Sequence, residues 1–244
     1  GGDLLIICDD GVFPLGKGLL SASVDRRVAL TDAIQNSIRL VANTYKSTFG
    51  WELCLASDHS ALILNVPGQN SHKQYVQNTL TGAWAEFEGW DAKCWLYSEL
   101  GLFYGSEGKV VRAWFSDSDD GEGIEADVLQ AFYDFGTKVE TKFFTMAKPY
   151  ISTGGVPSIL YSINGDYSPQ DPTGVLVTRP PNGMIWGSMY WGSMVWGGSL
   201  QQVQDWLTVG GIYKAAAFRL KVLNNQSEVE WAATDFIFRK GGLL

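Results

Sequence analysis

QNTLTGAWAEF (Gln77–Phe87), continuing into GWDAKCW (Gly89–Trp95), is the stretch of sequence that decides the fold. Extended-type residues, among them Tyr75 before it and Trp84 within it, flank the turn-forming cluster Asn78–Gly82. Asn, Thr and Gly supply local side-chain hydrogen bonds and positive φ, so this pattern predicts a strand–turn–strand hairpin. The stretch contains no nucleophile with a base beside it. We therefore interpret it as architectural and expect hairpins of the same kind before and after it.

The composition favours short strands and tight turns over helices. Of the 244 residues 45% are hydrophobic and 18% charged, enough apolar material for a packed core. Ten Trp, ten Tyr, twelve Phe and 28 Gly favour strands joined by turns. The net charge of −8 excludes a basic footprint for holding nucleic acid. No run of 18 apolar residues occurs, and we expect neither a membrane span nor a signal peptide.

Residues 1–120 are predicted to form a propeller-like β region with one amphipathic helix. Asp9-Asp10-Gly11 predicts a hairpin turn at the start of the chain. The helix is expected over residues 31–47, with Thr31 as its N-cap and Gly50 ending it. Its apolar positions recur at helical spacing, at Ile34, Ile38, Val41 and Tyr45. The chain begins within a strand pattern and without Met, so we expect it to be truncated from a longer protein.

Antiparallel strands follow, with hydrophobic residues at a period of two. Strands are predicted at 51–56 and 61–66, and again at 94–97, 102–105 and 109–114. Four short antiparallel strands, a loop and further strands are typical of β-propeller blades. The ring of blades would have to be completed by sequence outside this chain.

A domain boundary is predicted in the acidic stretch Ser116–Gly123. Its spacing fails as a calcium loop, because a Gly stands where the third ligand belongs and no properly spaced Glu follows. Residues 121–244 are expected to form an antiparallel β-sandwich. Its strands are predicted at 124–135, 142–152, 157–166, 213–223 and 228–239.

Residues with catalytic potential are few, and we predict no enzyme, no cofactor and no metal site. Asp58-His59-Ser60 contains the residue types of a hydrolytic triad, but adjacent residues cannot form the linear relay. His72 has no partner that the sequence identifies. A pair of carboxylates could assemble from the 26 acidic residues, although no pair stands out. Cys8, Cys54 and Cys94 each lie in an apolar run, which predicts buried thiols without disulfides.

Tryptophans recur every five residues in the Trp-Gly arm, residues 184–198. Trp186, Trp191 and Trp196 fit neither a helical nor a strand period, so they are predicted to lie on a surface as an irregular arm. That surface belongs either to the arm's own sandwich or to something else. A partner subunit and stacked sugars are the two functional alternatives.

About residues 51–244 resemble tail proteins of short-tailed bacteriophages. The motifs that carry the resemblance are Asn78–Trp84, Gly89–Trp95, Leu102-x-x-Gly105, Gly108–Val110, Gln130–Gly136, Lys142–Pro149, Val209–Ile212, Thr234–Phe236 and Gly241-Gly242, together with the acidic linker and the Trp-Gly arm. Similar proteins form the tubular or nozzle component beneath the portal, where propeller-like and sandwich domains repeat in a ring. The arm of that family carries Trp-Asp pairs, and Trp-Gly replaces them here, so the family's polar contact is not carried over.

The resemblance implies a virion structural protein, part of the nozzle or adaptor conduit of a short tail. Its expected partners are copies of itself in a ring and other tail and portal proteins, after assembly in the host cytoplasm. During ejection DNA would pass without specific binding, which suits the acidic charge. The alternative is a carbohydrate-binding tail or surface module that uses exposed Trp faces.

Overall fold

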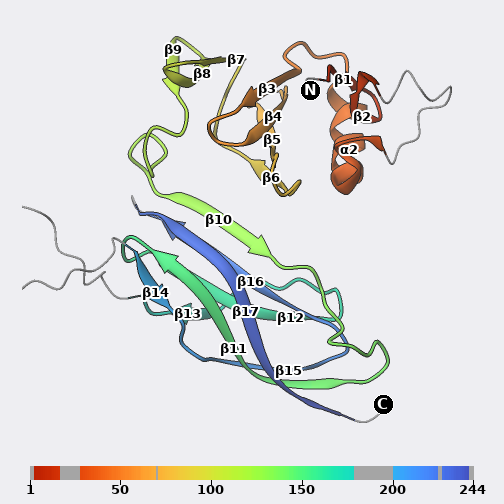
Figure 1. Ribbon diagram of the computed structural model, residues 1–244, viewed down its shortest axis with the longest axis vertical. Helices are drawn as coiled ribbons and strands as arrows, with labels where there is room; N and C mark the ends of the chain where they lie inside the picture. The colour runs from red at the N-terminus through yellow and green to blue at the C-terminus, as the bar shows by residue number, and fades with distance from the viewer. Residues whose placement is uncertain (1–2, 17–27, 70, 179–199, 225–226, 242–244) are drawn as a thin grey trace, which may run out of the picture. The chain divides into compact units, whose positions relative to one another are not determined.

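The protein is an all-β chain built from antiparallel sheets (Figure 1). The computed structural model describes residues 3–16, 28–69, 71–178, 200–224 and 227–241. Among the described residues, 53% lie in strands and 8% in helices, and none of the described sheets closes on itself. The predicted all-β, sandwich-like fold class is therefore confirmed. The Trp-Gly arm, 184–198, lies outside the described residues.

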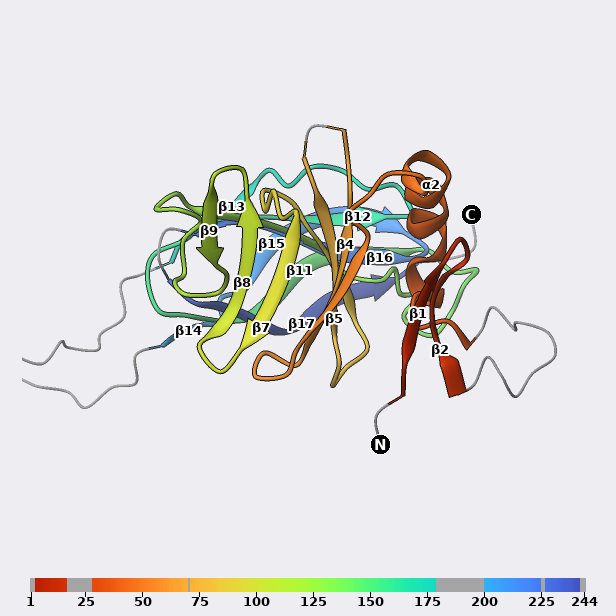
Figure 2. The same ribbon diagram turned by 90° about the horizontal axis from the view of Figure 1, so that it is seen from above.

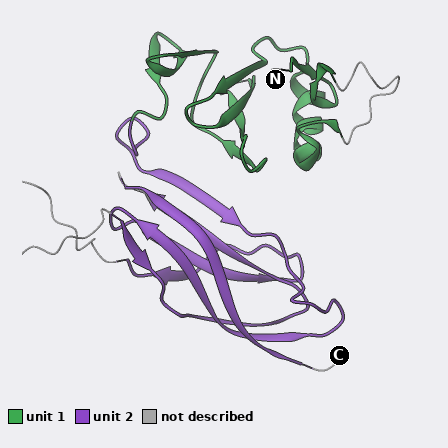
Figure 3. Cartoon of the chain, in the orientation of Figure 1, with its two compact units in different colours: residues 1–115 green, residues 116–244 purple. Residues whose placement is uncertain are grey.

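The chain divides into two compact units, residues 1–115 and 116–244 (Figure 3). The division falls at the start of the acidic Ser116–Gly123 stretch. Each unit has apolar clusters of its own, and we describe each by itself.

The first unit begins with a hairpin and a helix. Strands β1 (Leu5–Cys8) and β2 (Gly11–Pro14) pair antiparallel around the predicted Asp-Gly turn. The helical segment starts as the 3-10 turn η2 (Asp32–Ile34) and continues as α2 (Gln35–Tyr45).

The helical segment begins directly after Thr31, as predicted, but the expected cap does not form and the segment ends two residues earlier than residue 47. Thr31 makes no capping hydrogen bond, because its Oγ1 accepts the backbone N–H of Val12 at 3.2 Å and holds the hairpin instead. The helix ends at Tyr45, before Gly50, whose φ of 119° serves the turn into the next strand.

The deciding stretch forms the hairpin that the sequence predicts. It belongs to a four-stranded meander of β3 (Glu52–Ala56), β4 (Ala61–Val66), β5 (Lys73–Asn78) and β6 (Trp84–Phe87). In the turn, Asn78 Oδ1 accepts the N–H groups of Leu80 and Thr81 at 2.9 and 3.1 Å. Gly82 has a φ of 75°, a backbone conformation that glycine adopts without strain because it has no Cβ. The Asn and the Gly thus act as the sequence suggests.

A three-stranded meander completes the first unit. It consists of β7 (Cys94–Ser98), β8 (Gly101–Ser106) and β9 (Lys109–Arg112), which lie side by side in Figure 2. Trp90 lies at the centre of an aromatic cluster, with ring centroids of its neighbours 5.4–5.9 Å away. These neighbours are Phe87, Trp95, Tyr104 and Trp114.

The second unit is a sandwich of two antiparallel sheets. One sheet has the order β10-β16-β12-β13. In the other, β11 pairs with β17 along one edge and with β14 and β15 along the other. The strands are β10 (Ile124–Leu129), β11 (Lys142–Thr153), β12 (Ser158–Gly165), β13 (Gly174–Leu176), β14 (Gln201–Val203), β15 (Leu207–Tyr213), β16 (Ala216–Asn224) and β17 (Val229–Lys240).

Alternate residues of both sheets fill the sandwich core. Phe144 and Ile151 of β11 and Phe218 of β16 are at most 2% exposed and belong to one cluster. The intervening residues of β11 are partly or fully exposed, so the strand has one buried face and one outward face.

Two strand predictions in this unit need correction, and three strands were missed. The segment 124–135 is extended only to Leu129, and Tyr213 ends β15 rather than starting β16. Strands β13, β14 and β15 were not predicted. Two of them have only three residues, and β15 contains Gly210-Gly211, which weakens the strand pattern.

The cysteine prediction holds only in part. Among the described residues all three thiols are free, as expected. Cys54 is buried in the first unit, whereas Cys8 and Cys94 are exposed because their strands leave that face uncovered. An apolar run therefore does not by itself bury a residue in a short edge strand.

Candidate interaction surfaces of the β-sandwich

The predicted interaction residues Trp186, Trp191 and Trp196 lie outside the residues that the structure describes. The surfaces described below come instead from β10, β11, β14 and β17. None of the helices in the described part of the chain has the length and apolarity needed to cross a membrane.

Asp58-His59-Ser60 is a turn between β3 and β4. The N–H of His59 donates to Asp58 Oδ1 at 3.0 Å, and the His59 ring packs against Trp114 with centroids 4.6 Å apart. Ser60 has a φ of 49°, which fits a tight turn. The three side chains do not form a relay.

His72 has a partner that the sequence did not reveal. Its Nδ1 lies 2.9 Å from Asp91 Oδ1, across a separation of 19 residues. This hydrogen bond lowers the pKa of the Asp91 carboxyl. The pair joins the start of β5 to the loop before β7. We read it as a structural clamp on that loop.

Strand β10 forms an edge of the sandwich, and all six of its residues are exposed. Val128 lies opposite Leu220, a core residue of β16, so Val128 points toward the inside of the sandwich. Its side chain is nevertheless 48% exposed, and that of Ile124, on the same face, is 41% exposed. Among the described residues, the apolar face of this edge strand is therefore only partly covered.

The edge of the other sheet, β17, lies on the same side. Among the described strands β17 pairs with β11 alone. Gln130, just beyond β10, reaches Thr234 of β17, with Nε2 3.5 Å from Oγ1. We call this region, bounded by β10 and β17, the open side of the sandwich.

Ion pairs fix the outward face of β10. Arg219 donates two hydrogen bonds to Asp127, at 2.8 and 2.6 Å, and Lys221 pairs with Glu125. The bond to Arg219 lowers the pKa of Asp127, and the bond to Glu125 raises the pKa of Lys221. These pairs hold β10 in register on β16, so its other edge is presented in a defined position.

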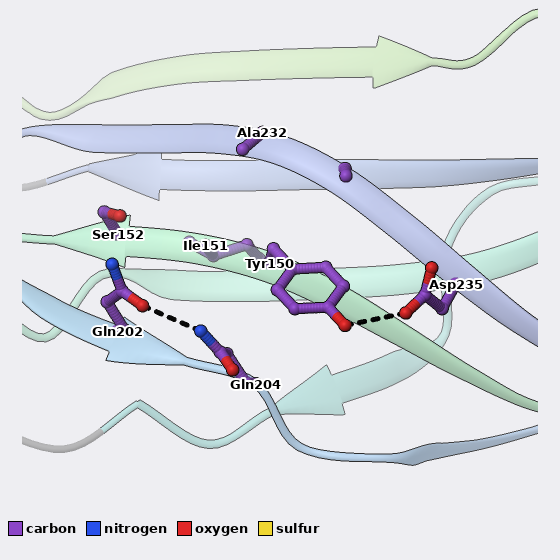
Figure 4. A pocket seen from close by; sticks show the side chains of 8 residues that line it. Tyr150, Ile151, Ser152, Gln202, Gln204, Ala232 and Asp235 are labelled. Atoms are coloured by element: carbon purple, nitrogen blue, oxygen red, sulfur yellow. Dashed lines mark hydrogen bonds between the residues drawn. The ribbon is translucent and has the colours of Figure 1, made fainter.

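A shallow hollow of about 390 Å³ lies on the outer face of the sheet that contains β11 (Figure 4). Tyr150 of β11 donates its hydroxyl to Asp235 Oδ2 of β17 at 2.6 Å. This bond raises the pKa of Tyr150, which stays a neutral phenol. Gln204 Nε2 donates to Gln202 Oε1 at 2.7 Å on the opposite border.

Lys148 borders the same face. Its Nζ lies 5.0 Å from the centroid of the Tyr150 ring and 5.8 Å from that of Trp206. Trp206 is 43% exposed. Two aromatic rings and a cation therefore gather beside the hollow.

Within the described ranges, no group of three or more His, Cys, Asp or Glu side chains is placed to hold a metal ion. In the acidic stretch, Asp119 and Glu122 exchange backbone hydrogen bonds of 3.0 and 2.9 Å and close a tight turn. No protein-family model matches the sequence, and a search of curated proteins finds no match either. The surfaces described above are therefore the features that indicate a function.

Proposed function

We propose that the chain is a structural module of a short bacteriophage tail, where it acts through contacts between subunits. Copies of it would form a ring with other tail and portal proteins and so build part of the conduit through which DNA leaves. The motifs around Asn78–Trp84 and Gly89–Trp95 suggest this family. In this proposed role the chain binds other subunits and catalyses no reaction.

The observation that carries the proposal is the open side of the sandwich. An edge strand with unpaired N–H and C=O groups is a template for pairing with a strand of another chain. Val128 and Ile124 add apolar surface that a neighbouring strand would cover. Lys and Pro are among the residues that block natural edges, and β10 contains neither, while its two acidic residues are paired with Arg219 and Lys221 of β16.

The charge of the chain is compatible with a conduit. A net charge of −8 gives no general attraction for phosphates, so DNA can pass without being held.

The proposal predicts that Ile124→Lys with Val128→Lys weakens self-association. Two charged side chains at the edge must be desolvated when a strand approaches. If the two substitutions remove a binding hot spot worth about 2 kcal/mol, the dissociation constant of self-association rises about 30-fold. Sedimentation velocity over a concentration series measures this change.

The matched control is Leu100→Lys with Val110→Lys in the first unit. These residues are 73% and 77% exposed and do not belong to β10 or β17, so the control adds the same charge at positions outside the strands that bound the open side. We expect the control to associate as the wild type does. Equal association of all three proteins would refute the role of the open side.

A further inference from the structure

We propose that the hollow on the outer face of β11, β14 and β17 binds a polysaccharide built of pyranose sugars. This goes beyond the assembly role and uses a different surface. It also differs from sugar stacking on Trp186, Trp191 and Trp196, because the residues come from the sandwich strands themselves.

The hollow supplies an aromatic platform. In Figure 4 the Tyr150 ring is seen broadside over β11, and its hydroxyl is anchored on Asp235. Trp206 stands nearby, since both rings lie within 6 Å of Lys148 Nζ. The C–H faces of a pyranose pack well on such rings, which bury apolar area while their polar tips stay hydrated. The cation–π contact of Lys148 at an exposed site is weak enough for a ligand to displace it.

Polar groups for sugar hydroxyls surround the platform. The bond between Gln204 and Gln202 uses one donor and one acceptor, and it leaves Gln202 Nε2 and Gln204 Oε1 to face a ligand. Asp235 accepts the Tyr150 hydroxyl at Oδ2, so its Oδ1 can accept a hydroxyl from a sugar. Donors and acceptors beside an aromatic face suit a ring that carries hydroxyls better than a purely apolar ligand.

The supporting strands hold these groups in place. Tyr150 alternates along β11 with the core residues Ala147 and Ile151, which are at most 2% exposed, and Tyr150 lies opposite Ala233 of β17. Ala233 has a small side chain, which leaves the hollow open beside the ring. Its volume of about 390 Å³ falls in the lower part of the range of ligand sites, about 300–1,000 Å³.

An array of purified bacterial polysaccharides, neutral and acidic, tests the proposal. The full chain should bind one or more of them, and affinity electrophoresis in that polysaccharide should measure the strength. Tyr150→Ala and Trp206→Ala should each weaken binding about tenfold or more, because each removes a stacking ring. Tyr150→Phe keeps the ring and should retain most of the binding.

Phe49→Ala is the matched control. Phe49 is 97% exposed and does not line the hollow, so this variant removes an exposed aromatic ring from outside the site and should bind as the wild type does. Lys148→Gln should weaken binding only if the bound polysaccharide is acidic, which distinguishes the two sugar classes.

The assay is repeated with Ile124→Lys/Val128→Lys, so that failure of the sugar site and failure of the assembly proposal can be told apart. Absence of binding to every polysaccharide on the array would overturn the sugar proposal. Binding that Tyr150→Ala and Trp206→Ala leave unchanged would overturn it as well.

Discussion

Replacing Lys142 by Met is expected to destabilise the second unit by about 3 kcal/mol, because an ammonium that bonds three carbonyls is lost. Lys142 is fully buried. Its Nζ donates to Glu140 O at 3.0 Å, to Lys214 O at 2.9 Å and to the carbonyl of Thr137. The side chain thus fastens the loop before β11 to the turn between β15 and β16.

Methionine fills most of the same volume but donates no hydrogen bond, so the three carbonyls lose their partner inside the protein. Thermal unfolding gives the size of the effect. Hydrogen exchange by mass spectrometry gives its location, with faster exchange expected in β11, β15 and β16.

Lys148→Met provides the control, since it makes the same substitution six residues further along the same strand at an outward position. It should change the free energy of unfolding by less than about 0.5 kcal/mol. If Lys142→Met proved as stable as Lys148→Met, the assigned role of the buried ammonium would be wrong.

The second large effect is expected for Asn65→Leu in the first unit. Asn65 is fully buried on β4, and its Nδ2 donates to Gly50 O at 3.0 Å and Ala92 O at 3.1 Å. Its Oδ1 accepts Gln74 Nε2 at 2.9 Å. Leucine leaves two backbone carbonyls and one amide donor short of a partner, which we expect to cost about 2–4 kcal/mol. Urea unfolding measures the change.

A double-mutant cycle with Gln74→Leu tests the network itself. Gln74 also donates to Trp90 O at 2.9 Å, so the two amides and the loop around residues 90–92 form one connected set. Once Asn65 is gone, removing Gln74 should cost less, and the cycle should give a coupling of about 0.5–3 kcal/mol. Strict additivity would contradict the network.

The fold was predictable where local chemistry determines it. The Asn78–Gly82 turn and the Asp9-Asp10-Gly11 turn follow from residues that favour tight turns, and both hairpins form. Thr31 precedes the helical segment as predicted, but the role of its side chain was not predictable, because its Oγ1 accepts the backbone N–H of Val12, a contact that depends on tertiary structure. The strand of Leu207–Tyr213 was missed because its Gly pair hides the pattern.

The candidate surfaces depend on residues that are far apart in the sequence. Tyr150 and Asp235 are separated by 85 residues, and their hydrogen bond follows from the pairing of β11 with β17. One signal was visible in the sequence: Tyr150 lies between Lys148 and Ser152 at every second position of the strand, which places its aromatic ring on the outward face. For β10 there was no such signal, because the sequence cannot tell that the inward face of Val128 is left uncovered.

Electron microscopy of the purified chain, imaged in negative stain with and without Ile124→Lys/Val128→Lys, tests the central claim most directly. The account predicts closed rings of the wild-type protein and dispersed single particles of the double variant. Wild-type particles that remain single at every concentration, or rings that survive the two lysines, would contradict assembly through the open side of the sandwich.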